Sequence, residues 1–162
     1  KLGYSRAEFL ELQLIATLCF AAFIPLSAIL AEKFGRKTTS IAVCIISAIF
    51  GLFFADMLAS GSTWIVFIFL CIGLAIMGLT YGPIGTVLSE IFPTSVRYTG
   101  SALTFNLAGI FGASFAPLIA TKLATTYGLA AVGYYLSAAS ILSLIAFLMI
   151  RETKHDDVNN QI

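Results

Sequence analysis

Charge is what this sequence most clearly lacks. Only 10% of its 162 residues are charged, against about 25% in soluble domains, while 59% are hydrophobic and the mean hydropathy is +0.99. A soluble fold of this length cannot bury so much apolar surface, so the sequence predicts an integral membrane protein. Between Thr38 and Arg151, the long stretches without any charged residue are Thr38–Ala55, Met57–Ser89, Tyr98–Thr121 and Leu123–Ile150.

Residues that usually build catalytic or metal sites are also scarce. The single histidine, His155, lies in a polar tail, and the three cysteines lie inside apolar segments without metal-ligand spacing: Cys19, Cys44 and Cys71. We interpret these cysteines as small packing residues. The sequence therefore predicts neither an enzyme nor a cofactor, and its net charge of +1 indicates no nucleic-acid partner.

The apolar stretches predict an all-α bundle of five transmembrane helices over residues 1–155, with a polar cytoplasmic tail over residues 151–162. Crossing a hydrocarbon core takes roughly 20 apolar residues. At the start of the first helix, Ser5 and Glu8 have the spacing of a capping box. The expected spans are 8–31, 39–55, 63–91, 99–125 and 130–150.

Basic residues are distributed unequally between the two ends of these spans. Three lie on one side: Lys1, Arg6 and Lys122. Six lie on the other: Lys33, Arg36, Lys37, Arg97, Arg151 and Lys154. The positive-inside rule makes the second side cytoplasmic, which predicts an N-terminus outside and a C-terminus inside. Aromatic residues at the opposite helix ends fit interface anchors: Trp64, Tyr127, Tyr134 and Tyr135.

Three cytoplasmic segments carry a family resemblance. The loop Ala28–Lys37 resembles the G-x-x-x-D-R-x-G-R-R segment of the major facilitator superfamily, with Ala28 in place of glycine and Glu32 in place of aspartate. The segment Ser89–Gly100 resembles the E-x6-R segment of sugar and metabolite porters. The segment Arg151–Lys154 resembles the P-E-T-K sequence that follows the last helix of many such porters, although arginine stands where proline is usual.

The amino-acid sequences of Glu90–Gly100 and Asn106–Ala116 are most similar to those of the metabolite:proton symporter branch of this superfamily. This resemblance implies the last five helices of a twelve-helix secondary transporter in the plasma membrane, specifically the bacterial inner membrane. Such a carrier moves a small polar metabolite, an organic acid or a zwitterion, by alternating access with proton coupling. We therefore expect a missing N-terminal half within a longer chain. A non-transporting receptor or scaffold on the same fold, and a stand-alone five-helix protein, remain open alternatives.

The resemblance also implies a role for the charges at the cytoplasmic surface. In the family, they form a salt-bridge cluster that holds the cytoplasmic side closed while the transporter faces outward. The alternative is that they only set topology, because exposed ion pairs contribute little. The residues at these places are Glu32, Arg36, Lys37, Glu90, Arg97 and Glu152.

A substrate site is expected near the bilayer midplane, where transporter helices are often interrupted. Gly82 and Pro83 predict such a helix break in the third span, next to Tyr81. Asn106 in the fourth span must face either a cavity or a neighbouring helix, because an unpartnered amide is costly in lipid. By family implication, Gln13, Tyr81 and Asn106 are the candidate substrate contacts. No Asp, Glu, Lys, Arg or His occupies the middle of a span, so the proton site is expected in helices outside this chain.

Overall fold

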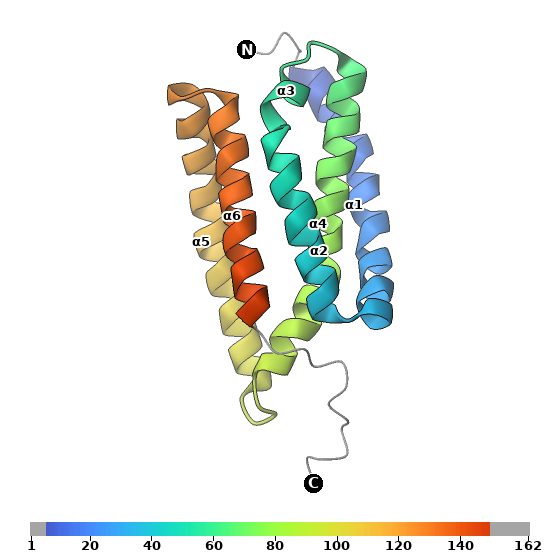
Figure 1. Ribbon diagram of the computed structural model, residues 1–162, viewed down its shortest axis with the longest axis vertical. Helices are drawn as coiled ribbons and strands as arrows, with labels where there is room; N and C mark the ends of the chain where they lie inside the picture. Colours follow the sequence, from blue (N-terminus) through green and yellow to red (C-terminus); the bar gives the residue numbers. More distant parts are fainter. Residues whose placement is uncertain (1–5, 150–162) are drawn as a thin grey trace.

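The computed structural model describes residues 6–149, and all regular secondary structure in this range is α-helical (Figure 1). This confirms the all-α class for the described part of the chain. The elements are α1 (Arg6–Phe34), α2 (Arg36–Leu52), α3 (Phe54–Leu58), α4 (Thr63–Ile91), α5 (Arg97–Thr126) and α6 (Leu129–Met149).

Among the described helices, four are long and apolar enough to cross a membrane: Phe9–Phe34, Thr63–Ile91, Arg97–Thr126 and Leu129–Met149. The remaining long helix, α2, has 17 residues, which corresponds to about 26 Å of rise. That is slightly shorter than a hydrocarbon core of about 30 Å. The expectation of five spans therefore stays a prediction.

One expected helix is divided. The sequence predicted a single helix over 39–55, whereas α2 ends at Leu52 and the short α3 begins at Phe54. Between them, the Phe53 amide donates to the Phe50 carbonyl at 3.2 Å, a tighter i to i−3 bond that interrupts the α-helical ladder. Neither proline nor a positive-φ glycine marks this break, which is why the sequence pattern did not reveal it.

The connection between α1 and α2 is a single residue, Gly35, whose φ of 99° lies in the region that favours glycine. It reverses the chain so that α1 and α2 run antiparallel (Figure 1). The α4–α5 connection lies at this same end of the bundle. We call this the Gly35 end; the sequence predicts it to be cytoplasmic.

Two helix pairs, α1 with α4 and α2 with α6, make the most extensive contacts. Where α4 meets α1, a Cβ added at Gly82 would lie 2.9 Å from both the Ala28 nitrogen and the Ile24 carbonyl oxygen. Where α6 meets α2, the Ser137 hydroxyl donates to the Ala48 carbonyl at 2.7 Å. Small residues and interhelical hydrogen bonds of this kind stabilise helix pairs where no water is present.

The helix α5 stands at the margin of the bundle (Figure 1) and contacts only α4 and α6 among the described elements. None of its residues is buried. By contrast, the core of the described bundle includes Leu58, Val66 and Phe69, with Phe50 stacked on Phe69 at a ring-centroid distance of 4.9 Å. One apolar helix of the chain therefore remains almost without partners.

Candidate functional site

Two segments that are far apart in the sequence meet at the Gly35 end. The Arg36 guanidinium, at the first residue of α2, forms an ion pair with the Glu90 carboxylate in the last turn of α4. Both side chains are partly buried, at 31% and 24% exposure. The structure thus joins the loop after α1 to the end of α4 by opposite charges.

The other residues of the expected salt-bridge cluster lie around this pair in different environments. The Lys37 ammonium donates to the Leu148 carbonyl at 3.0 Å, which ties the start of α2 to the end of α6. Glu32 is exposed in the last turn of α1. The Arg97 side chain is exposed at the start of α5, where its Nε donates to the Phe92 carbonyl at 3.4 Å. Glu152 lies outside the described residues.

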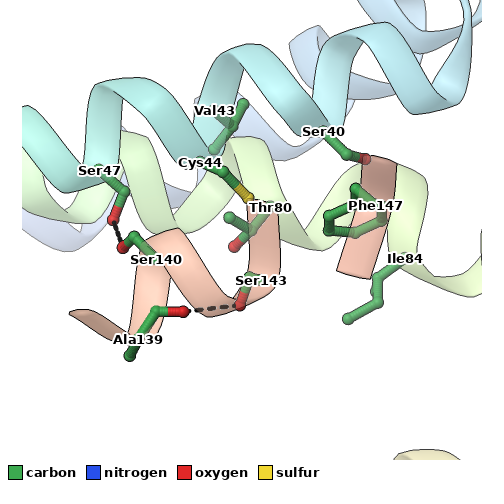
Figure 2. A pocket seen from close by; sticks show the side chains of 10 residues that line it. All are labelled: Ser40, Val43, Cys44, Ser47, Thr80, Ile84, Ala139, Ser140, Ser143 and Phe147. Carbon is green, nitrogen blue, oxygen red and sulfur yellow. Dashed lines mark hydrogen bonds between the residues drawn. The ribbon is translucent and has the colours of Figure 1, made fainter. Parts of the chain in front are cut away.

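A cavity of about 260 Å³ lies between α2, α4 and α6 (Figure 2). Much of its lining consists of small polar side chains. Across it, the Ser140 hydroxyl donates to the Ser47 hydroxyl at 2.9 Å, whereas Ser143 donates to the Ala139 carbonyl on its own helix at 3.0 Å. The polar lining residues are Ser40, Cys44, Ser47, Thr80, Ser140 and Ser143.

Sequence reasoning missed this cavity, although a signal was present. Ser40 and Ser47 are seven residues apart on α2, and Ser140 and Ser143 are three apart on α6. At these spacings, the side chains of each helix share one face. Because serine is common in membrane helices, only the packing of α2 against α6 identifies the two faces as partners.

A second cavity, of about 680 Å³, lies between the end of α4 and the start of α5, at the Gly35 end. Its lining contains one cation, Arg97, and no acidic residue. Asn106, nine residues after Arg97 on α5, also lines this cavity. Its side-chain amide donates to the Ala102 carbonyl at 2.7 Å. This cavity therefore has one positive charge in its lining, whereas the first cavity is lined by uncharged groups alone.

The three candidate substrate contacts lie on three different helices. Tyr81 on α4 is 45% exposed, and its ring packs edge-on against Phe20 of α1 at 5.5 Å. Gln13 is exposed on α1, seven residues before Phe20 and so about 10 Å away along the helix axis. Asn106 lines the second cavity on α5. The structure brings Thr80, next to Tyr81, to the first cavity instead.

At the expected helix break, the structure has continuous α-helix. Gly82 and Pro83 lie inside α4, which is α-helical from Thr63 to Ile91. Pro83 is buried, and Gly82 lies against α1. The last turns of α4 change direction towards α5 (Figure 1), as expected near a residue that removes one helical hydrogen bond.

The sequence comparisons agree with this architecture. The family model of the Major Facilitator Superfamily matches residues 1–161. The chain belongs to the Major Facilitator Superfamily. It is 46% identical over 97% of its length to the inner membrane metabolite transport protein YhjE of Escherichia coli (strain K12), of which it covers 36%. It is 41% identical over 97% of its length to a putative metabolite transport protein of Haemophilus influenzae, again covering 36%.

A more distant relative is the citrate-proton symporter of Klebsiella pneumoniae, which is 28% identical over 88% of this chain. The match covers 32% of the symporter's length. No solved structure matches the chain. The chain thus spans about a third of the length of the curated superfamily members it matches. As a superfamily member with several apolar helices of spanning length, it is an integral membrane protein.

Proposed function

We propose that the chain is part of a secondary active transporter that moves a small polar metabolite, an organic acid or a zwitterion, by alternating access. The observation that carries this proposal is the superfamily match over residues 1–161, together with relatives named as metabolite transport proteins. The name of the closely similar inner membrane protein supports placing the carrier in a bacterial inner membrane. Proton coupling is supported by the more distant relative named as a proton symporter.

The arrangement at the Gly35 end supports a gating role for its charges. The Arg36–Glu90 pair joins α2 to α4, and Lys37 joins α2 to α6. Separating α2 from α4 at this end requires breaking the ion pair, which biases the conformational equilibrium towards the closed arrangement. We include Glu32, Arg97 and Glu152 in the proposed cluster.

The proposed whole carrier includes helices besides those of this chain. The unburied surface of α5 and the one-third coverage of the relatives support an N-terminal half that completes the bundle. We retain five spans over residues 1–155 with a cytoplasmic tail over residues 151–162, an outside N-terminus and a cytoplasmic C-terminus. Because no Asp, Glu, Lys, Arg or His lies mid-span here, we place the proton site in the other helices.

Transport by the full-length protein tests the proposal directly. The protein is reconstituted into proteoliposomes with an imposed proton gradient, and accumulation of radiolabelled organic acids and betaine-like zwitterions is followed. Accumulation that a protonophore abolishes supports a proton-coupled carrier. Binding of a metabolite without any accumulation would instead favour a receptor on the same fold.

A further inference from the structure

The lining of the cavity between α4 and α5 contains a guanidinium, several hydroxyl groups and one amide, and no carboxylate. We propose that this cavity binds an oxyanion, a carboxylate or a phosphate, through the Arg97 guanidinium assisted by Thr94, Tyr98 and Asn106. These four residues line one space of about 680 Å³, within the range of about 300–1,000 Å³ typical of ligand pockets.

Arg97 supplies the charge. Within residues 6–149, the side chain has a single hydrogen bond, from Nε to the Phe92 carbonyl at 3.4 Å, so the donors of its two terminal amino groups are not used by this part of the chain. The side chain lines the cavity. Arg36, at the same end of the bundle, differs because it is paired with Glu90. A guanidinium holds a carboxylate or phosphate by paired hydrogen bonds, the strongest class of polar contact in proteins.

The other polar groups of the lining can donate hydrogen bonds to an anion held by Arg97. In the described part of the chain, the hydroxyls of Thr94 and Tyr98 make no hydrogen bond, and the Asn106 amide uses one of its two N–H groups on the Ala102 carbonyl. The hydroxyls of Ser89 and Ser101, by contrast, already donate to main-chain carbonyls. With free donors and no lining carboxylate, the cavity is suited to an oxyanion rather than a cation.

Two sources can supply this chemistry: a transported metabolite that carries a carboxylate, or the phosphate of an anionic lipid headgroup. The first source rests on the proposed function and narrows it to organic anions. The second does not depend on transport. Leu88 and Phe105 line the same space as Arg97, so either source would place apolar atoms beside its charge.

The test uses the purified full-length protein in nanodiscs of phosphatidylcholine, with malonate and inorganic phosphate as soluble probes and calorimetry as the readout. Arg97→Gln should weaken probe binding at least about tenfold, as expected for a charge-assisted hydrogen bond. Tyr98→Phe and Thr94→Val, which keep the charge, should each weaken it about two- to tenfold. The matched control Lys33→Gln removes a cation from the same end but not from this cavity, and should change binding less than about twofold.

A second arm tests the lipid source by native mass spectrometry of protein from nanodiscs that contain phosphatidylglycerol. Retention of this lipid by the parent protein and the Lys33→Gln variant, but not by Arg97→Gln, supports a headgroup site. Binding of both soluble and lipid anions that is independent of Arg97, Thr94 and Tyr98 overturns the proposal. Uptake assays on the same variants separate the two ideas: transport without Arg97-dependent anion binding overturns only the site, and anion binding without transport overturns only the proposed function.

Discussion

The Arg36 guanidinium at the start of α2 is paired with the Glu90 carboxylate at the end of α4, across more than fifty residues of sequence. The pair is partly exposed, so its direct contribution to stability is small, of the order of 0.2–1 kcal/mol. Its position matters more than its strength. It connects the two loops whose separation the proposed inward opening requires.

Charge exchange at this pair is the first test. In the full-length protein, Arg36→Glu or Glu90→Arg alone places like charges opposite each other, and either should lower the uptake rate severalfold. The double variant Arg36→Glu/Glu90→Arg restores the attraction and should recover much of that rate. A double-mutant cycle on uptake and thermal stability gives the coupling free energy. A coupling of zero would reduce the pair to a marker of topology.

The contact between α1 and α4 predicts a strong dependence on residue size at one glycine. Gly82→Ala places a Cβ 2.9 Å from the Ala28 nitrogen and the Ile24 oxygen and also displaces the Ser27 hydroxyl. Overpacking of this kind costs about 1–3 kcal/mol, so the melting temperature should fall. Gly85→Ala, on the same helix with no atom within 4 Å of its added Cβ, is the control and should be neutral or stabilising. Equal effects of both substitutions would contradict this packing.

A smaller effect on stability is expected for the pair of serine hydroxyls that joins α2 to α6. Ser140→Ala removes the hydroxyl that lies 2.9 Å from both the Ser47 hydroxyl and the Leu136 carbonyl of its own helix. Interhelical bonds of the first type contribute about 0.6 kcal/mol on average in membranes. Ser143→Ala is the matched control, because that hydroxyl donates to Ala139 within its own helix. Unfolding in mixed detergents should distinguish the two variants. Identical stabilities would mean that the Ser47–Ser140 bond contributes nothing measurable.

The orientation of the chain in the membrane can be tested at two exposed positions, Thr38 near the start of α2 and Ser60 just after α3. In a background without the native cysteines, Ser60→Cys should react with an impermeant thiol reagent in intact cells, and Thr38→Cys should not. The basis is the excess of basic residues at the Gly35 end. Both side chains are exposed, so burial does not explain a difference. Labelling of Thr38→Cys from outside would reverse the proposed topology.

The sequence was most informative where one physical rule dominates. Uncharged runs long enough to cross a bilayer predicted the all-α class, and Pro93 marks the loop just beyond Ile91, where α4 ends. The break at Phe53 was not predictable, because it arises from a single i to i−3 hydrogen bond without a proline or a positive-φ glycine.

Interactions between helices were harder to predict than the helices themselves. The family resemblance placed Arg36 and Glu90 in one cluster of six charged residues, but only the packing of α2 near α4 identifies these two as an ion pair. The hydroxyls of Ser47 and Ser140 gave a periodic signal on each helix without indicating which faces meet. The roles of Gln13, Tyr81 and Asn106 in substrate binding stay predictions.

Tyr81 and Asn106 provide the last test, because each carries a polar group that can be removed with little change in packing. Tyr81 is 45% exposed beside Phe20, and Tyr81→Phe keeps that ring contact while removing only the hydroxyl. If this hydroxyl contacts substrate, affinity should fall by the value of one neutral hydrogen bond, about 0.5–1.5 kcal/mol, without loss of stability. Asn106→Ala also removes the amide bond to the Ala102 carbonyl. That bond lies within one helix turn, so its loss should change stability little.

Both variants should therefore express at parental levels and melt close to the parental temperature, while substrate affinity falls by about two- to tenfold. The matched control is Thr17→Ser on α1, whose hydroxyl can keep its bond to the Gln13 carbonyl, now 2.8 Å long. Binding and melting temperature are measured on the same purified full-length samples. An Asn106→Ala protein that binds normally but melts early would assign the amide to helix packing, and parental affinity in both variants would remove these residues from the site.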